Sequence, residues 1–169
     1  MSPVLSGTIN GLGEAKMSGI IRGVTMSMAL TAMPTMALAF GNDDHWVSGW
    51  GMGVAEAVIT KGPGNQIYVT CDDGADQNAT GVSFTLAGDT SKDSSIQLIF
   101  DNEDPEDYSL WDGEIPTDCR VCAQTYDAVI DKLKKHSTVH VKFQDGLGTR
   151  FSLKGATKAI GECTADFYR

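Results

Sequence analysis

Two of the four cysteines stand in the sequence Cys119-Arg-Val-Cys122, a spacing that supports thiol chemistry. In thiol-disulfide oxidoreductases, the first cysteine of such a pair lies at a helix N-terminus after a buried strand, where its thiolate is stabilised. The residues before Cys119 are acidic and include Pro116, so they do not read as a buried strand. We therefore expect a structural disulfide, with thiol-disulfide exchange at Cys119 and Cys122 as the alternative.

The other two cysteines, Cys71 and Cys163, make the count even. Four cysteines in an exported domain indicate two disulfides, for which three pairings exist. We favour Cys119 with Cys122 and Cys71 with Cys163. The second bridge closes a loop of roughly 90 residues, which stabilises the fold by about 4 kcal/mol in the chain-entropy model.

An acidic segment, residues 101–115, is the second candidate for function, because it carries seven carboxylates around aromatic side chains. It lacks the D-x-[DN]-x-[DN]-G spacing of an EF-hand calcium loop. An aromatic anchor within a charged rim is typical of protein-binding hot spots. We expect a partner-binding surface formed by Asp104, Glu106, Asp107, Tyr108 and Trp111. The alternative is a solvated acidic loop that binds nothing.

No other arrangement of residues indicates catalysis or a cofactor. The three histidines are His45, His136 and His140, and the helix predicted before His136 ends too early to carry a metal-binding pair. A zinc site at Cys119 and Cys122 would need a second CxxC or an HxxxH pair. No GxSxG nucleophile motif is present. We therefore expect no catalytic residue, no metal and no cofactor.

Alternating apolar residues and turn sequences predict the elements that position these residues. Strands are expected at 54–60, 66–71, 81–87, 95–100, 139–143 and 149–153. The apolar stripe Tyr126, Val129, Ile130 and Leu133 predicts a helix over 125–135, and a short helix is expected over 156–160. Residues 40–50 are expected to be irregular. The order ββββ-α-ββ-α predicts an α+β fold, an antiparallel meander or sandwich with one covering helix and two disulfides.

The N-terminal part is typical of a secretory signal. Residues 18–22 include Arg22, residues 23–36 are uncharged and mostly apolar, and Ala37-Leu-Ala39 fits signal peptidase. We expect residues 1–39 to comprise this signal and an upstream extension, with translation starting at Met17, and residues 40–169 to form one exported domain without a membrane span. The alternative is an amphipathic N-terminal helix of the folded protein.

The C-terminal half resembles small exported bacterial proteins of the type VI secretion-associated VasI family and the invasion-associated locus B family. The resemblance covers about residues 66–163 and rests on the Phe100-Asp101 step, a following tryptophan, a helix ending in Leu-Lys-Lys, and Phe151-Ser-Leu-Lys-Gly155 before Cys163. Those families carry one cysteine in an early strand and one after the final helix, which Cys71 and Cys163 match. The resemblance implies compartment and fold more than activity.

The net charge of −9 disfavours nucleic-acid binding, which needs a basic surface, and suits a basic protein partner. We expect a periplasmic or secreted, non-catalytic binding or accessory module of a Gram-negative bacterium, whose partner is another protein. An alternative is an inhibitor of a basic secreted enzyme such as lysozyme, and another is the thiol-disulfide oxidoreductase considered above.

Overall fold

The described residues of the computed structural model are 40–51, 53–72, 79–91 and 94–168. They form two antiparallel sheets and two α-helices, so the predicted α+β class is confirmed. Sheet A contains, in spatial order, β1 (Val47–Gly51), β2 (Val54–Thr60), β3 (Gln66–Asp72), β4 (Gly81–Leu86) and β5 (Asp89–Thr90), and β8 (Glu114–Ile115) also pairs with β4. Sheet B contains β10 (Gly148–Ser152), β9 (Thr138–Lys142), β6 (Ser95–Phe100) and β7 (Glu106–Ser109). The helices are α1 (Arg120–Lys135) and α2 (Ala156–Ile160), followed by the 3-10 helix η1 (Asp166–Tyr168).

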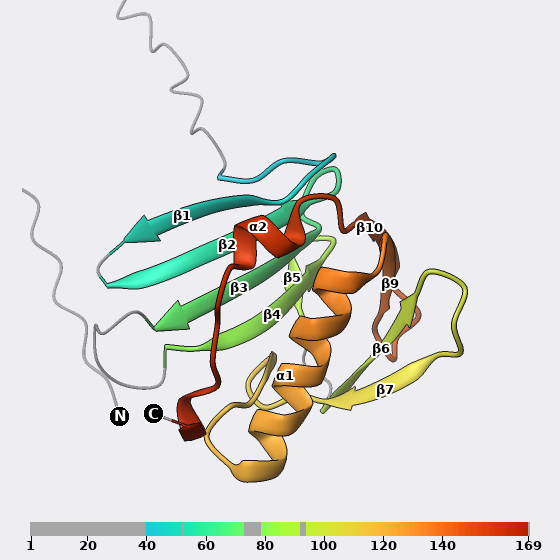
Figure 1. The fold of residues 1–169 in the computed structure, drawn as a ribbon. Coiled ribbons are helices and arrows are strands. Elements are labelled where there is room, and N and C mark those ends of the chain that lie inside the picture. The colour runs from blue at the N-terminus through green and yellow to red at the C-terminus, as the bar shows by residue number, and fades with distance from the viewer. Residues whose placement is uncertain (1–39, 52, 73–78, 92–93, 169) are drawn as a thin grey trace, which may run out of the picture. The chain divides into compact units, whose positions relative to one another are not determined.

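The predicted hairpin of β2 and β3 is present, and β3 shows why its residues form a strand. Ile67, Val69 and Cys71 alternate with more exposed residues and are buried. Val69 lies between Ala57 of β2 and Val82 of β4, so apolar side chains from three strands share one face. Figure 1 shows α1 and α2 lying on the same face of this sheet.

The strands of the fold differ in part from the sequence prediction. Residues 47–51 form the edge strand β1 and are not irregular, although the segment contains Gly49 and Gly51. The ring of Phe40 occupies the space over Gly49, where a Cβ atom would lie 2.9 Å from the ring. The fourth predicted strand, β6, leaves the meander and pairs with β7 and β9 in sheet B. Alternation shows which face of a strand is buried, but it does not identify the neighbouring strand.

The helix α1 begins at Arg120, five residues before the predicted start, because Cys119 serves as its N-cap. Its predicted stripe of Tyr126, Val129, Ile130 and Leu133 is buried. Lys132, Lys134 and Lys135 lie in the last turn, where positive charge complements the helix dipole. The short helix α2 has the predicted bounds.

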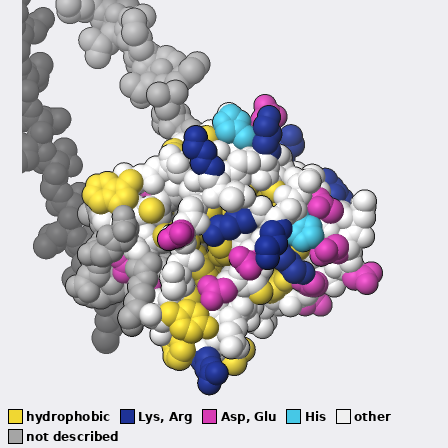
Figure 2. Space-filling model, viewed as in Figure 1, with side chains coloured by type: hydrophobic (Ala, Val, Ile, Leu, Met, Phe, Trp, Pro, Cys, Tyr) yellow, Lys and Arg dark blue, Asp and Glu magenta, His cyan; other side chains and the backbone are white. Residues whose placement is uncertain are grey.

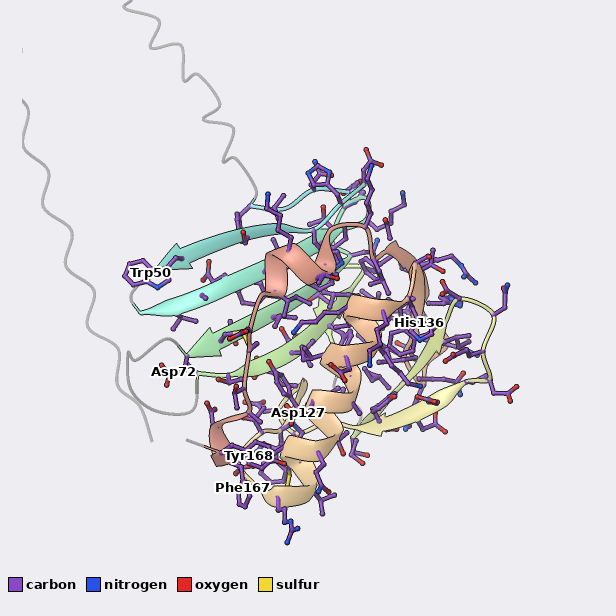
Figure 3. The ribbon with its side chains drawn as sticks, in the orientation of Figure 1. Trp50, Asp72, Asp127, His136, Phe167 and Tyr168 are labelled. Carbon is purple, nitrogen blue, oxygen red and sulfur yellow. A yellow bond between two sulfur atoms is a disulfide. The ribbon has the colours of Figure 1, made fainter. Side chains whose placement is uncertain are left out.

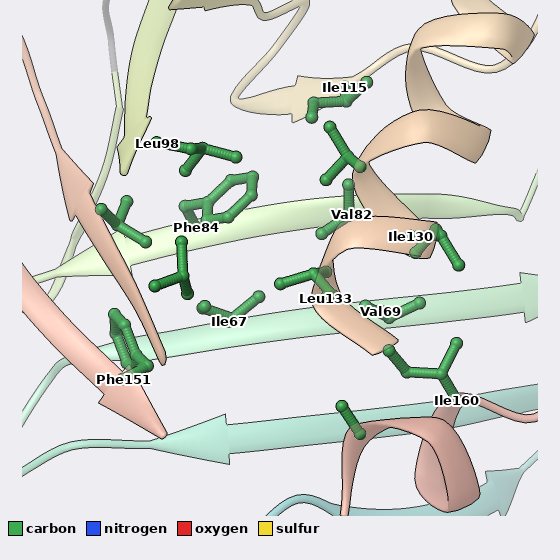
Figure 4. Packing of buried hydrophobic residues seen from close by; sticks show 14 of the residues in the cluster. Ile67, Val69, Val82, Phe84, Leu98, Ile115, Ile130, Leu133, Phe151 and Ile160 are labelled. Atoms are coloured by element: carbon green, nitrogen blue, oxygen red, sulfur yellow. The ribbon is translucent and has the colours of Figure 1, made fainter. Parts of the chain in front are cut away.

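One hydrophobic core receives side chains from both sheets and both helices. Figure 4 shows Phe84 of β4, Leu98 of β6 and Phe151 of β10 on the side of the sheets that faces Leu133 of α1. Ile160 of α2 lies near sheet A in the same view. All five side chains are at most 5% exposed. Burying one side chain of this size stabilises the fold by about 1.5–3 kcal/mol, so this packing holds α1 against both sheets.

Two disulfides join the cysteines in the expected pairing, Cys71 with Cys163 and Cys119 with Cys122. The first bridge connects β3 to the segment after α2 across 92 residues of sequence. The second lies within the first turn of α1. Disulfides persist in oxidising compartments, so both bridges fit a protein outside the cytoplasm. Among the helices of the described ranges, none has the length and apolar character needed to cross a membrane.

Candidate protein-binding surface

Within the acidic segment, two residues of the expected binding surface point toward α1. The register of β7 with β6 pairs Glu106 with Leu98 and Tyr108 with Ile96, so both side chains lie on the buried face of sheet B. Lys132 of α1 donates to the Glu106 carboxylate at 2.5 Å, and the Tyr108 hydroxyl donates to the same carboxylate.

Both groups have shifted pKa values. The Lys132 ammonium, then the Tyr108 hydroxyl, hold the pKa of Glu106 below its ordinary value. Burial and the bond to Glu106 raise the pKa of the Tyr108 phenol. The Glu106 carboxylate therefore attaches β7 to Lys132 of α1, and the Tyr108 hydroxyl binds the same carboxylate within β7.

Trp111 is the most exposed large hydrophobic side chain in the described residues, at 79%. It precedes the two-residue loop Asp112-Gly113, in which both residues have positive φ angles, 51° and 81°. The Trp111 N–H donates to the Glu114 carbonyl at 2.8 Å, and the Glu114 N–H donates back to the Trp111 carbonyl at 3.1 Å. This is the geometry of a type I′ turn, which Asp-Gly favours. A tight turn therefore holds the indole outside the sheet.

The first turn of α1 exposes a second apolar side chain, Val121, at 70%. It stands between Cys119 and Cys122, whose disulfide closes the turn. The sulfur of Cys119 also accepts the backbone N–H of Cys122 at 3.1 Å, which satisfies one of the free amides at the helix start. Because the turn is fixed at both ends, Val121 is held toward solvent.

The C-terminal helix η1 adds two aromatic side chains, Phe167 and Tyr168, which are 45% and 49% exposed. Their rings meet edge to face, with centroids 5.4 Å apart. The Phe167 N–H donates to the Thr117 carbonyl at 3.1 Å, while Asp166 accepts from the Thr117 hydroxyl at 3.1 Å and from the Thr80 N–H at 3.3 Å. These bonds anchor η1 beside the segment that enters α1. Figure 3 shows Phe167 and Tyr168 at this end of the helix.

We call Trp111, Val121, Phe167 and Tyr168 the helix-start surface. Figure 2 shows hydrophobic side chains gathered at the end of the molecule where α1 begins. A hollow of about 370 Å³ beside Trp111 and a groove of about 350 Å³ beside Val121 share Ile115 and Pro116 in their walls. The two depressions are therefore neighbours. The groove is also lined by Tyr108 and by the Cys119–Cys122 disulfide.

The rim of this surface is acidic. Residues 103–125 contain seven carboxylate side chains and a single basic one, Arg120. Asp112, Glu114 and Asp118 line the hollow beside Trp111, and Asp107 lines the groove. Burial, and then the charge of Asp112, raise the pKa of Glu114. This rim has the electrostatic character that attracts a cationic partner.

Of the five residues expected from sequence to bind a partner, some face solvent and others contact residues of the same chain. Trp111 belongs to the helix-start surface and Asp107 to its rim, although the Asp107 carboxylate also accepts from Gln97 at 3.2 Å. Asp104 is exposed in the loop before β7. Glu106 instead accepts hydrogen bonds from Lys132 and from Tyr108.

Sequence reasoning missed Val121, Phe167 and Tyr168. The exposure of Val121 could have been predicted from the CRVC spacing, because the Cys119–Cys122 disulfide closes a helical turn that leaves Val121 in solvent. The positions of Phe167 and Tyr168 could not be predicted from local sequence. They depend on hydrogen bonds from η1 to Thr80 and Thr117, which are far away in the sequence.

The histidines lie on separate elements, as expected from the helix end. His136 follows α1 and contacts Asp101 at 3.1 Å, while His140 lies on β9. Burial, and then the charges of Arg150 and Lys142, lower the pKa of His140. Within the described ranges, no three His, Cys, Asp or Glu side chains are grouped in a way that could hold a metal ion.

A protein-family model, YfjT, matches residues 44–160. This span is more than half of the chain, so the chain belongs to the YfjT family. The expected resemblance to the VasI and invasion-associated locus B families is therefore wrong. It rested on strand, helix and cysteine spacings that unrelated disulfide-bonded α+β domains also share. No curated protein and no solved structure matches the chain.

Proposed function

We propose that this member of the YfjT family is an exported binding module that holds a cationic protein on its helix-start surface. The observation that carries this proposal is the gathering of exposed apolar side chains. Of the seven large hydrophobic side chains exposed in the described residues, four belong to this surface. Contiguous exposed apolar patches rimmed by polar groups mark interaction sites, and tryptophan and tyrosine are enriched among binding hot spots.

The acidic rim supports a cationic partner over a neutral one. Asp112 and Asp118 line the hollow beside Trp111 and Asp107 lines the groove beside Val121, and Arg120 is the single basic residue in the segment 103–125. Charge complementarity of this kind speeds association and rejects acidic partners. Basic secreted hydrolases such as lysozyme have the required charge, so inhibition of such an enzyme is a specific form of the proposal.

Export to the periplasm or the medium is part of the same proposal. The two disulfides support it, and so does the signal-like sequence that ends at Ala39, which lies outside the described residues. The test is the intact mass of the protein recovered from the periplasm and from the medium. A mass that begins at Phe40 with no free thiol is expected. A mass that retains residues 1–39, with four free thiols, would contradict export.

The binding proposal is tested with two tryptophan variants that remove equal side chains from different places. Trp111→Ala removes the most exposed side chain of the helix-start surface, whereas Trp50→Ala removes a 66% exposed tryptophan at the end of β1, which lies apart from Phe167 and Tyr168 (Figure 3). Calorimetry against a panel of basic proteins that includes lysozyme, at low and high salt, measures the affinity.

We expect at least one basic protein to bind in a salt-dependent manner. Trp111→Ala should weaken that binding by at least about 2 kcal/mol, roughly thirtyfold, while Trp50→Ala leaves it unchanged. Equal effects of both variants, or no binding to any basic protein at low salt, would overturn the proposal.

A further inference from the structure

We propose that the Cys119–Cys122 disulfide is a thiol-exchange site, in which Cys119 forms the mixed disulfide with an external thiol and Cys122 is released as the leaving thiolate. This activity goes beyond the proposed binding function. Both cysteines line the groove of about 350 Å³ together with Tyr108, Pro116 and Val121. A reactive disulfide needs an incoming thiol to reach one of its sulfur atoms, and this groove opens directly onto the bridge.

The two disulfides of the protein differ in access. Cys119 is exposed and Cys122 is partly exposed at the start of α1. Cys71 is only 6% exposed on β3, and its partner Cys163, which is partly exposed, contacts the Tyr126 hydroxyl at 2.8 Å. The Cys119–Cys122 bridge is therefore the more open to attack by thiols, while the Cys71–Cys163 bridge serves as an internal structural control.

The surroundings of Cys119 favour its thiolate. Cys119 is the N-cap of a 16-residue helix, and its sulfur accepts the backbone N–H of Cys122 at 3.1 Å. The positive end of the helix dipole and this amide stabilise a negative sulfur at the same position. Arg120 adds a positive charge in the motif and Asp118 a negative one, so the adjacent side chains add no net charge. The helix start itself thus favours Cys119 as a leaving and attacking group.

The exchange balances as two displacements. A thiolate from outside attacks the Cys119 sulfur, the bond between the two cysteine sulfurs breaks, and Cys122 leaves as a thiolate that takes up a proton. A second external thiolate then attacks the external sulfur of the mixed disulfide, and Cys119 leaves as a thiolate. Two external thiols are oxidised to one disulfide, and the bridge is reduced to two thiols.

The groove also indicates which thiols react best. Its apolar lining of Tyr108, Pro116 and Val121 accommodates a side chain beside the bridge, and Asp107 contributes negative charge at its edge. Cysteine in a cationic peptide should therefore react faster than glutathione, which is anionic. A small thiol and a protein thiol share the same chemistry, so the experiment compares them directly.

The first experiment uses the native protein. It is incubated with reduced glutathione, with a lysine-flanked cysteine peptide or with a glutamate-flanked one, then alkylated and mapped by mass spectrometry. We expect modification at Cys119 and Cys122 and intact bridging of Cys71 with Cys163. The lysine peptide should react at least about tenfold faster than the glutamate peptide at low salt, and less so at high salt.

The second experiment assigns the roles of the two sulfurs. Cys122→Ser leaves Cys119 at the helix N-cap, and Cys119→Ser leaves Cys122 in the first turn. We expect Cys119 in the first variant to be alkylated at least about tenfold faster at pH 7 than Cys122 in the second, and to keep a stable mixed disulfide with the lysine peptide.

Resistance of the native Cys119–Cys122 bridge to all three thiols would overturn the exchange proposal, as would earlier opening of the Cys71–Cys163 bridge. Equal alkylation rates in the two variants would overturn the assignment to Cys119. Because these readouts follow sulfur chemistry, they stay independent of whether Trp111→Ala weakens protein binding.

Discussion

The ammonium group of Lys132 on α1 lies 2.5 Å from the carboxylate of Glu106 on β7. The same ammonium lies 3.7 Å from the Glu103 carboxylate and 5.4 Å from the centre of the Phe100 ring. One side chain thus attaches the edge strand of sheet B to the helix whose first turn contributes Val121 to the proposed surface. The position of the groove wall at Tyr108 depends on this attachment, because Tyr108 donates to the same carboxylate.

Lys132→Gln should therefore destabilise the protein by about 1 kcal/mol, a value limited by the partial exposure of both charged groups. The matched control is Lys135→Gln, whose ion pair with Asp131 at 3.3 Å is largely exposed on the same helix. That variant should change the free energy of unfolding by less than about 0.5 kcal/mol. Urea unfolding measures both. Equal decreases in the free energy of unfolding for the two variants would contradict the attachment of β7 by Lys132.

Acid should weaken the fold partly through Asp101. The backbone N–H of Ser137, followed by that of Thr138 and the His136 side chain, holds the pKa of the Asp101 carboxyl below its ordinary value. A group whose pKa is lowered by folding contributes stability above its unfolded pKa, and this contribution disappears as pH falls through the folded pKa.

Asp101→Asn tests this contribution, because asparagine tolerates the φ angle of 47° at this position. Urea midpoints measured between pH 7 and pH 3 should fall less steeply for the variant than for the native protein. Parallel pH profiles would contradict the role of the carboxylate.

Two facing turns offer a matched pair of glycines. Gly64 has a φ of +74°, and a Cβ atom there would lie 2.6 Å from the backbone nitrogen of Gly88. Gly88 has a φ of +88°, but a Cβ atom there would meet no other atom within 4 Å. Gly88→Ala should cost about 1–2 kcal/mol from the left-handed backbone alone. Gly64→Ala should cost at least about 1 kcal/mol more, since the backbone must also move. Thermal unfolding distinguishes the two, and equal costs would contradict the close approach.

The two disulfides should contribute unequally to stability. In the chain-entropy model, the Cys71–Cys163 bridge, with its sequence separation of 92, contributes about 4–5 kcal/mol. The Cys119–Cys122 bridge closes a separation of 3 and contributes about 2 kcal/mol. Double serine variants of each bridge, compared by denaturant unfolding, test the difference. A larger loss from the Cys119 and Cys122 variant would contradict the assignment of Cys71–Cys163 as the main structural bridge.

The elements that could be predicted from sequence are those fixed by local patterns. The stripe of Tyr126, Val129, Ile130 and Leu133 defined the buried face of α1, and alternation defined the buried face of β3. The early start of α1 escaped prediction because a cysteine is an uncommon N-cap, and here its sulfur performs that role. The pairing of β6 with β9 escaped it because a pairing between distant strands leaves no local trace.

The candidate surface was predictable only in part, for the same reason. The aromatic residues of the acidic segment identified Trp111, but their chemistry did not show that Glu106 is bound by a lysine on α1. The contribution of η1 depends on Asp166 reaching Thr80, which is 86 residues away in sequence. The sequence composition predicted an acidic surface with aromatic residues, but only the tertiary structure showed which residues form it.

The most direct test of the account is site-specific photo-crosslinking in living cells, with benzoylphenylalanine in place of Trp111, Val121 or Trp50. We predict that positions 111 and 121 crosslink to the same basic protein outside the cytoplasm, and that position 50 does not. Absence of any adduct at positions 111 and 121, or the same adduct at position 50, would contradict the claim that the helix-start surface binds a cationic partner.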